Sequence, residues 1–426
     1  MTTPWEKWTA KSHKKSRSSV KIREIQSAYR NSMTITLLFD LDETLLDTNL
    51  TAFVQTYFQK LAAHLAPHVP PETLLKYLML GTRQMMASED PSHTLREVFD
   101  GNFYPHFDVD RESIAPVIED FYDNVFPTIR EVTKPIPGVV EFIEWAFGAG
   151  HRVVIATSPY FPRKATYHRL RWAGLPPEKY PFALISTYDD FHFTKPHVAY
   201  FAEVLARLGW PDEPILMVGN DVEQDLIPAS TLGLATYHAV DVTPSANGFN
   251  ATGRGRLAEL RAWLEQTDPA TLMPSYSSSA SLLAILRSTP AALTSLLASE
   301  ALTSRPSADE WSVTEILCHM RDVEQEVDIP RIQTILNEDE PFIPAQLPDE
   351  WAKTREYNKQ DGLSALRDFT TARIQTLEML GNLAPAQWSR KARHAIFGPT
   401  TLRELVGFNA EHDRLHIQQV WKNLHS

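Results

Sequence analysis

The chain has 426 residues, which is too long for one typical domain and predicts two or three. Its 43% hydrophobic and 22% charged residues are ordinary for a globular protein, whereas the net charge of -12 argues against a general nucleic-acid binder. A single cysteine, Cys318, excludes an intrachain disulfide, and no apolar run approaches the about 18 residues of a membrane helix. We therefore expect a cytoplasmic protein without nucleic-acid or membrane partners.

Residues 1–32 form the first segment, and their composition differs from that of the rest. Eight Lys and Arg residues stand against two acidic ones, Glu6 and Glu24, with serines between them. No apolar core of a secretory signal is present, and although an organellar transit peptide fits a basic leader, lysine outweighs arginine here. We expect a disordered basic tail or an artefact of start choice, because Met33 immediately precedes the first predicted strand.

Residues 35–39 form an apolar run that predicts a fully buried strand, and Asp40 and Asp42 follow at its end. Side chains two apart on an extended segment leave on the same face, so both carboxylates should point into one crevice. Such a pair is costly to bury unless a cation or a reaction needs it. A pair that only caps the next turn fits the same spacing.

Residues 48 to about 134 have the pattern of an all-helical insertion. Phe53, Tyr57, Leu61 and Leu65 recur at four-residue spacing, and further helical patterns follow along the segment. We assign the aromatic residues and methionines of this insertion mostly to its core, with no ligand role.

Strands and helices alternate between residues 137 and 266. This alternation predicts a parallel sheet with helices on both faces and a site at the carboxyl ends of the strands. The predicted strands are 152–156, 182–186, 215–218 and 234–237, and the predicted helices are 138–147, 163–173, 197–208, 222–232 and 257–264. The segment 241–255 is polar and glycine-containing, and no strand is predicted there.

Residues 267–280, with two prolines and a run of serines, predict a linker between an α/β domain at 33–266 and a second domain at 281–426. No strand signal follows the linker. Helical periodicity there predicts an all-α four-helix bundle, with Pro290 breaking or restarting the first helix. The four predicted helices are 281–301, 313–337, 363–381 and 401–424.

Residues with chemical use follow the later strands of the α/β domain. One strand runs into Thr157, Lys195 opens a helix, and another strand runs into Asp221, with Asp225 one helical turn later. With the two aspartates of the first strand, they occur in the order of the four motifs of the haloacid dehalogenase superfamily of phosphohydrolases. Residues 33 to 266 thus resemble that family, which implies a Rossmann-like sheet with a helical cap inserted after the first strand.

The resemblance implies a role for each motif residue. Asp40 is the expected nucleophile, which forms an aspartyl-phosphate, and Asp42 is the expected general acid and base. Thr157 is expected to donate a hydrogen bond to a phosphoryl oxygen. Lys195 is expected to neutralise charge on Asp40 and on the phosphoryl group.

The same resemblance implies a cofactor and a reaction type. Mg²⁺ is expected on Asp40, the backbone carbonyl of Asp42 and Asp221, with Asp225 as the second candidate. Family members that displace halide do not keep an acid two residues after the nucleophile, so Asp42 favours a phosphatase or phosphotransferase. A helical cap usually excludes polymers, so the expected substrate is a small phosphorylated metabolite. The alternatives are a lysine that caps a helix and a solvated pair of aspartates.

The predicted bundle carries a second group of residues. His412 and His416 lie four apart and share one helix face, and His319 on a facing helix can supply a third ligand for Zn²⁺ or Ni²⁺. In a chain with 15 histidines, surface or core histidines are the simpler interpretation of such a pair. The segments Trp311-Ser312-Val313 and 397–402, which lead to these histidines, resemble those of the DinB-like metal-dependent bundle family.

That second resemblance leaves three interpretations of the bundle. The family has a three-histidine site, and some members are thiol-dependent transferases or isomerases, so the bundle is either a fused metal-binding domain or the seat of such a transferase. The third interpretation is a non-catalytic interaction module, through which the chain could form a homodimer. Cys318 lies beside His319 in sequence and so points elsewhere on a helix, which favours core packing.

Overall fold

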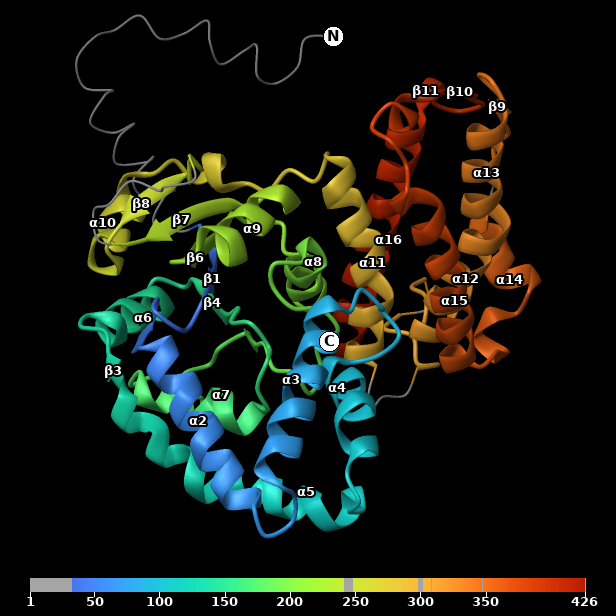
Figure 1. Cartoon of the computed structure of the whole chain (residues 1–426). Helices are drawn as coiled ribbons and strands as arrows, with labels where there is room; N and C mark the ends of the chain where they lie inside the picture. The colour runs from blue at the N-terminus through green and yellow to red at the C-terminus, as the bar shows by residue number, and fades with distance from the viewer. Residues whose placement is uncertain (1–32, 241–247, 298–301, 308, 347, 426) are drawn as a thin grey trace, which may run out of the picture.

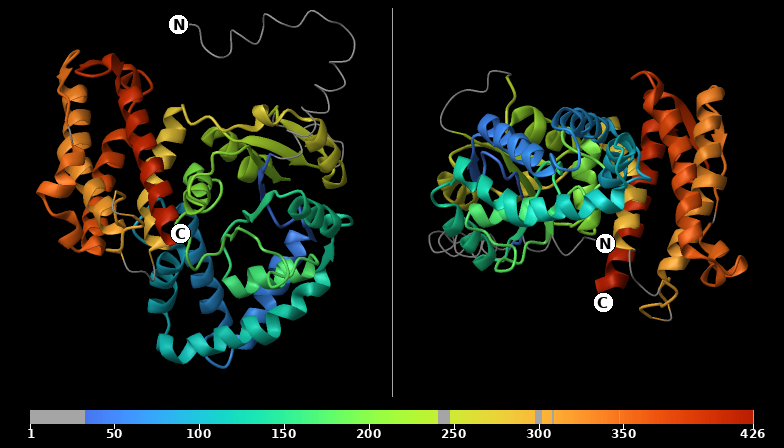
Figure 2. Two further views of the ribbon diagram at one scale, coloured as in Figure 1. Left: turned by 180° about the vertical axis from the view of Figure 1, so that it is seen from behind. Right: turned by 60° about the horizontal axis from the view of Figure 1, so that its bottom comes forward.

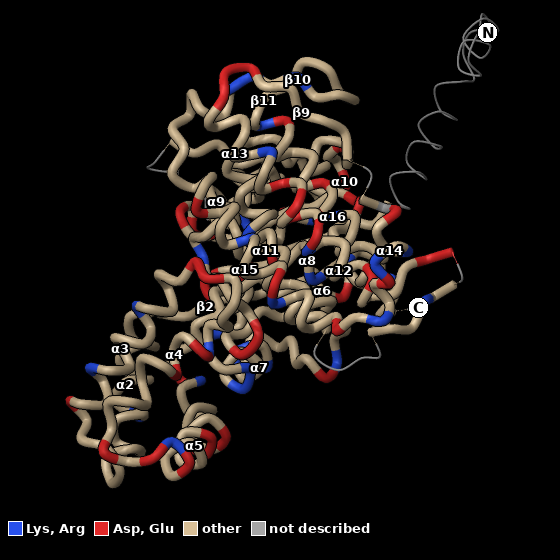
Figure 3. The backbone as a smooth tube through the Cα atoms, turned by 90° about the vertical axis from the view of Figure 1, so that its right-hand side faces the viewer, with Lys and Arg blue, Asp and Glu red and all other residues tan. Residues whose placement is uncertain are grey.

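The structure is a computed structural model, and it describes residues 33–240, 248–297, 302–307, 309–346 and 348–425. The predicted tail at 1–32 lies outside the described residues. An α/β domain with a helical cap lies beside a helical bundle (Figure 1). Basic and acidic residues are interspersed over both domains (Figure 3). No helix in the described part of the chain is long and apolar enough to cross a membrane.

The α/β domain contains a six-stranded sheet in the order β5–β4–β1–β6–β7–β8, with every pair of neighbours parallel. Its strands are β1 (Thr36–Phe39), β4 (Arg152–Ile155), β5 (Leu184–Ile185), β6 (Ile215–Gly219), β7 (Ala235–Ala239) and β8 (Gly253–Gly255). The predicted parallel sheet is confirmed. The strand β8 was not predicted, because its Gly-Arg-Gly sequence carries no apolar signal.

Helices cover both faces of this sheet, and the alternation of side chains along β1 shows how. Leu37 and Phe39 point to one hydrophobic cluster, with α6 (Val139–Gly148) and α10 (Leu257–Gln266), whereas Leu38 points to another. The second face is covered by α8 (Val198–Arg207) and α9 (Ile227–Leu232), while α7 (Arg163–Trp172) packs against the cap. Because both faces are covered, β1 is buried along its whole length.

The cap follows β1 and hangs on a two-stranded neck. β2 (Leu46–Thr48) leads into the cap, and β3 (Thr133–Pro135) leaves it, paired antiparallel with β2. The cap helices are α2 (Leu50–Leu65), α3 (Pro71–Ala87), α4 (Leu95–Phe103) and α5 (Arg111–Asp120), followed by a π-helical turn (Phe121–Val125) and a 3₁₀ helix (Phe126–Val132). The predicted helical insertion after the first strand is confirmed.

The bundle consists of α11 (Ser279–Leu296), α12 (Val313–Val323), α13 (Ile329–Asn337), α15 (Gly362–Gly381) and α16 (Leu402–His425). A π-helical turn, η6 (Glu324–Asp328), separates α12 from α13 within the predicted helix at 313–337. The prediction that Pro290 breaks the first helix was wrong. Proline lacks the N–H that would bond to the carbonyl of Leu286, and the Arg373 guanidinium donates to that carbonyl instead, at 3.0 Å.

The expectation that no strand follows the linker was also wrong. β9 (Phe342–Ile343), β10 (Lys391–His394) and β11 (Gly398–Thr401) form a small sheet at one end of the bundle (Figure 1). The short helix α14 (Trp351–Thr354) packs against α12 instead. β9 is only the dipeptide Phe-Ile, and β10 (Lys-Ala-Arg-His) and β11 (Gly-Pro-Thr-Thr) contain few apolar residues, so none of them has the apolar pattern on which the prediction relied.

The two domains share one hydrophobic core. Helix α8 packs along α11, and its residues 199–206 are all buried, so the bundle covers the outer side of this helix (Figure 2). Gln418 on α16 donates to the carbonyl of Trp210 at 3.0 Å. The connecting segment also packs against the α/β domain, because Ser275 donates its N–H to the carbonyl of Gly233. The two backbones are so close that a Cβ added to Gly233 would lie 1.9 Å from the carbonyl oxygen of Ser275. The bundle is therefore a packed neighbour of the α/β domain.

Candidate active site and candidate metal centre

The segments that follow β1, β5 and β6 bring a buried lysine and two carboxylates together. Lys195 Nζ lies 2.8 Å from Asp40 Oδ1 and 2.6 Å from Asp225 Oδ1. Asp40 follows β1 directly, and its N–H donates to the carbonyl of Val218 at the end of β6. Lys195 is 155 residues from Asp40 and 30 residues from Asp225 in sequence, and the parallel topology brings all three to one edge of the sheet.

The electrostatics of this group favour an additional cation. Burial, followed by the negative charge of Asp225, raises the pKa of Asp40 from 3.8 to about 7, although Lys195 opposes the shift. Burial lowers the pKa of Lys195, but Asp225 and Asp40 outweigh it, and the net pKa is raised. Since Asp40 must be ionised to act as a nucleophile, a divalent ion beside it would favour the reactive form.

Asp42 lies on the same cavity but has different partners. Its Oδ1 accepts a hydrogen bond from Thr48 Oγ1 at 2.9 Å, and its Oδ2 accepts one from Arg169 Nη1 at 2.5 Å. Sequence reasoning missed Arg169, which belongs to α7 and is buried. The signal was available, because Arg169 occupies the buried face of that helix together with Ala165 and Leu170, where an unpaired arginine would be costly.

The two acids of the last motif, Asp221 and Asp225, have different surroundings in the structure. Asp221 Oδ1 accepts the N–H groups of Glu223 and Gln224 at 2.8 and 2.9 Å, so it caps the turn after β6, while it also lines the cavity. Asp225 is buried against Lys195, and it also accepts the N–H of Asp221 at 3.1 Å. A Cβ at Gly219 would lie 2.3 Å from Asp225 Oδ2, so this packing needs glycine.

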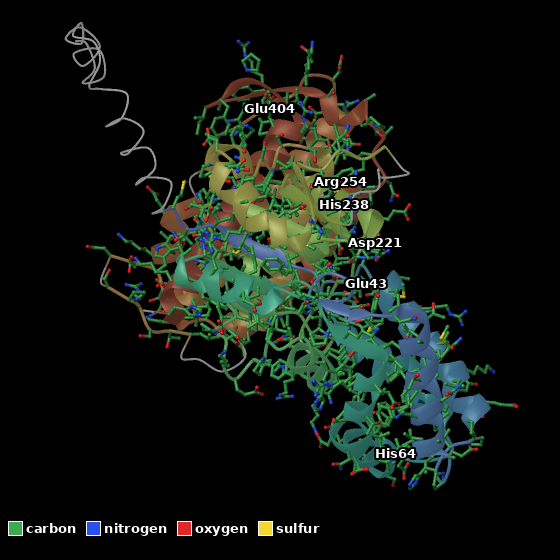
Figure 4. All side chains as sticks on the ribbon, turned by 90° about the vertical axis from the view of Figure 1, so that its left-hand side faces the viewer. Glu43, His64, Asp221, His238, Arg254 and Glu404 are labelled. Atoms are coloured by element: carbon green, nitrogen blue, oxygen red, sulfur yellow. The ribbon has the colours of Figure 1, made fainter. Side chains whose placement is uncertain are left out.

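The remaining predicted residue of the α/β domain, Thr157, lies at the start of the loop between β4 and α7. It is buried and lines the same cavity, and its carbonyl accepts hydrogen bonds from Ser186 Oγ at 2.6 Å and Tyr200 Oη at 2.8 Å. These bonds fix the backbone beside the expected phosphoryl position. Figure 4 shows Asp221 and Glu43, another lining residue, where the α/β domain meets the cap.

The site residues present oxygen ligands of the kind that Mg²⁺ prefers. The aspartates Asp40, Asp42, Asp221 and Asp225 all line one cavity. Among the described residues, however, three carboxylates with ligand atoms all within 4.8 Å of one another do not occur there.

The cavity has a volume of about 530 Å³ and extends from the aspartates into the cap. The residues that continue it come from α2, α3, α4 and the segment after them. Many of these are the aromatic residues and methionines that the sequence assigned to the core of the insertion without a ligand role. Phe53, Tyr57 and Phe103 are buried core residues, as predicted, and together with Met79 they also line the cavity.

Three histidines of the bundle converge on one point. His412 Nε2 lies 3.0 Å from His319 Nε2 and 3.0 Å from His416 Nε2, and Trp311 stacks on His416 at a centroid distance of 6.1 Å. They form the one group of three potential ligands within 4.8 Å found among the described residues. Nitrogen ligands of tetrahedral zinc at about 2.0–2.1 Å lie about 3.3 Å apart, so the separation fits such an ion.

The protonation of these imidazoles also fits a metal. Burial, followed by the neighbouring His416, lowers the pKa of His319 from 6.5 to about 3, and the same causes lower the pKa of His412 well below its ordinary value. Neutral rings offer lone pairs to a cation. His412 Nε2 faces two other Nε2 atoms and, if neutral, can satisfy only one of them by a hydrogen bond.

The charged and thiol neighbours of the histidines point elsewhere. Asp413 is paired with Arg373, and Asp322 accepts hydrogen bonds from Arg355 Nη1 and Tyr357 Oη at 2.6 and 2.7 Å. Cys318 is buried, as its predicted core role requires.

Comparison with protein-family models gives two matches. Residues 37–239 match the model of haloacid dehalogenase-like hydrolases, and residues 282–420 match that of the DinB superfamily. The chain is also similar to the glyceraldehyde 3-phosphate phosphatase of Methanothermobacter thermautotrophicus, with 23% identity over 47% of this chain and 82% of the relative. A phosphoglycolate phosphatase of Mesorhizobium japonicum is 26% identical over 48% of this chain and 82% of its own length.

The uncharacterized protein YuaE of Bacillus subtilis is also similar to this chain, with 26% identity over 29% of this chain and 83% of YuaE. Both resemblances drawn from the motifs are confirmed.

Proposed function

We propose that the haloacid dehalogenase-like hydrolase domain of residues 37–239, which this chain joins to a DinB superfamily domain at 282–420, is a Mg²⁺-dependent phosphatase. The observation that carries the proposal is the Asp40–Lys195–Asp225 group at the carboxyl edge of the sheet, open to a cavity. A nucleophile held by a cation, with a second carboxylate two residues on, suits phosphoryl transfer. The similarity to two phosphatases supports the same reaction.

In the first step, an Asp40 carboxylate oxygen attacks the phosphorus atom, and the bond from phosphorus to the alcohol oxygen breaks. Asp42 gives its proton to that oxygen, so the alcohol leaves neutral. In the second step, water attacks the phosphorus of the aspartyl-phosphate and gives a proton to Asp42. The Asp40–phosphorus bond breaks, inorganic phosphate leaves, and both aspartates return to their starting states.

The surrounding residues hold these groups in place. Lys195 fixes Asp40 and offers positive charge to the phosphoryl oxygens, and Thr157 can donate a hydrogen bond to one of them. Arg169 and Thr48 orient Asp42. Mg²⁺, held by Asp40, the carbonyl of Asp42 and Asp221, would neutralise negative charge on the transferring group.

The variant Asp40→Asn tests this proposal. It keeps the shape of the side chain but removes the nucleophile, so phosphate release from p-nitrophenyl phosphate should fall at least about 1,000-fold, with unchanged circular dichroism. The exposed Asp47, on strand β2, gives a matched control, and Asp47→Asn should keep full activity. Turnover by Asp40→Asn at the parental rate would refute the proposal.

We also propose that His319, His412 and His416 hold a Zn²⁺ or Ni²⁺ ion, because their Nε2 atoms converge. Three histidines with an open fourth position would suit a thiol-dependent transferase, and a bundle used only for dimerisation would need no metal. Metal analysis of the full chain should find one equivalent, which His412→Ala removes and the control His425→Ala, at the end of the same helix, retains. A metal-free parent protein would refute this centre.

A further inference from the structure

The cap side of the active-site cavity is lined mostly by apolar side chains. Helices α2 to α5 and the turns that follow α4 and α5 contribute no charged side chain to the lining. Instead they contribute aliphatic and aromatic side chains, among them Leu61, Leu65, Leu74, Leu78, Phe103 and Ile118. The charged lining residues all come from the α/β domain, so the cavity has one charged end and one apolar end.

The few polar atoms on the cap side are mostly engaged already. Tyr57 Oη and Tyr122 Oη are hydrogen-bonded to each other at 2.9 Å, and Thr82 Oγ1 donates to the carbonyl of Leu78 within its own helix at 2.8 Å. Of the polar side chains that the cap contributes, only Tyr104 remains. A sugar or hydroxyacid phosphate would bury hydroxyl or carboxylate groups here with few partners, which is costly.

The cavity is also long. Its lining includes Leu50 at the first turn of α2 and Leu65 at the last, and α2 rises about 1.5 Å per residue, so the apolar part extends about 22 Å. The first turn of α2 follows the neck, where Thr48 contacts Asp42. His64, one residue from the far end, lies at the tip of the cap, away from Asp221 (Figure 4). An extended chain could therefore run from the aspartates along α2.

Three lining residues that are exposed at the protein surface are also consistent with an extended apolar chain in the cavity. Leu50, Met79 and Met86 are 59%, 44% and 39% exposed, although each is a large apolar side chain. These side chains continue the apolar lining to the protein surface and form an apolar entrance. An apolar group can therefore enter the cavity there without passing a charged side chain.

Building on the phosphatase activity proposed above, we infer that the substrate is the phosphate monoester of an alcohol with an extended apolar chain. The phosphate lies at Asp40 and Lys195, and the chain lies along α2 and α3 of the cap. A cavity of about 530 Å³ falls within the about 300–1,000 Å³ of sites for drug-sized ligands, far more than a two- or three-carbon phosphate fills.

The test measures kcat/KM for butyl, octyl and dodecyl phosphate, below the concentrations at which they form micelles, against 2-phosphoglycolate and glyceraldehyde 3-phosphate. Burial of one methylene is worth about 0.8 kcal/mol, so each added methylene should raise kcat/KM up to about four-fold until the cavity is filled. Equal or faster hydrolysis of the two polar phosphates would overturn the inference and leave the phosphatase standing. No phosphate release from any of these or from p-nitrophenyl phosphate would overturn both.

A volume variant shows whether the chain lies in this cavity. Thr82 is partly buried on α3, midway along the lining, so Thr82→Phe should place a ring across the path of a long chain. The ratio of kcat/KM for dodecyl over butyl phosphate should fall at least about ten-fold, whereas Thr82→Ser should keep it. An unchanged ratio in Thr82→Phe, in a protein that still hydrolyses butyl phosphate, would place the chain elsewhere and overturn the inference.

Discussion

Each domain buries one cation between two carboxylates, and the two groups differ in access. In the α/β domain, Lys195 lies between Asp40 and Asp225, and the side chain of Asp40 retains 12% exposure toward the cavity. In the bundle, Arg373 lies between Glu324 and Asp413, and all three side chains are 2% exposed. The same arrangement of charges can thus take part in a reaction where a ligand can reach it, and it can only stabilise the fold where no ligand can reach it.

The donors differ as well. The Arg373 guanidinium donates to both carboxylates and to the carbonyl of Leu286, which the missing N–H of Pro290 leaves open. All three guanidinium nitrogens of Arg373 therefore donate hydrogen bonds to groups inside the bundle. Lys195 holds Asp40 whose pKa is raised to about 7, so that group still favours further positive charge. The comparison predicts that loss of Arg373 lowers the stability of the protein, whereas loss of Lys195 mainly lowers its turnover.

The largest expected effect is on the bundle. Arg373→Met leaves Glu324 and Asp413 buried without their cation, and breaking a buried pair in this way costs about 3–5 kcal/mol. The free energy of unfolding in urea measures it. Arg367→Met, on the exposed face of the same helix, is the control and should stay within about 0.5 kcal/mol. A loss below 1 kcal/mol for Arg373→Met would mean that water reaches this group.

The second prediction concerns the lysine. Lys195→Met should lower kcat at least about 100-fold, because a preorganised positive donor toward the phosphoryl group is lost. Its loss of stability should be smaller than that of Arg373→Met, since Asp40 can take up a proton near neutral pH. The control is the exposed Lys179→Met. A variant that keeps its kcat but unfolds more easily than Arg373→Met would reverse the comparison.

The two sites also differ in how far the sequence could predict them. In the α/β domain, Asp40, Lys195 and Asp225 all lie in segments that follow the carboxyl ends of parallel strands, so the topology brings them to one edge of the sheet. Arg169 was missed although it shares the buried face of α7 with Ala165 and Leu170, because three further basic residues of this helix made it look like one more surface arginine. The sequence also left open which acid would contact a metal, because Asp221 and Asp225 are only four residues apart. Their partners differ through tertiary contacts, since Asp225 is paired with Lys195, which lies 30 residues away in sequence.

In the bundle, local spacing places His412 and His416 on one face, but nothing local predicts that His319 meets them from another helix. Helix continuation through Pro290 depends on Arg373, which lies 83 positions further on, and no local rule contains that partner. The apolar cavity was hidden for a similar reason. The spacing of Phe53 and Tyr57 predicts that a face is buried but cannot show whether protein or substrate covers it.

The third prediction separates the two acids of the last motif. Asp221→Asn should raise the Mg²⁺ concentration for half-maximal activity at least about ten-fold, because a ligand carboxylate is lost while Lys195 keeps both partners. Asp225→Asn should instead lower kcat through Lys195, with less change in the Mg²⁺ requirement. The exposed cap residue Asp108, changed to Asn, serves as the control. The opposite assignment of effects would make Asp225 the metal ligand.

The smallest expected effect tests the protonation of the bundle cluster. Burial, followed by the charge of Glu324, raises the pKa of Asp328 well above its ordinary 3.8, although Arg373 opposes the shift. Between 3.8 and the raised pKa, the folded protein holds a proton that the unfolded chain has released, so the free energy of unfolding falls as pH rises through this window. Asp328→Asn cannot ionise and should flatten that fall, measured by urea unfolding at pH 5 and pH 8, while the exposed Asp339→Asn should keep it. Parallel profiles for Asp328→Asn and the parent would mean that Asp328 is ionised in the fold, and that Arg373 then compensates three carboxylates where Lys195 compensates two.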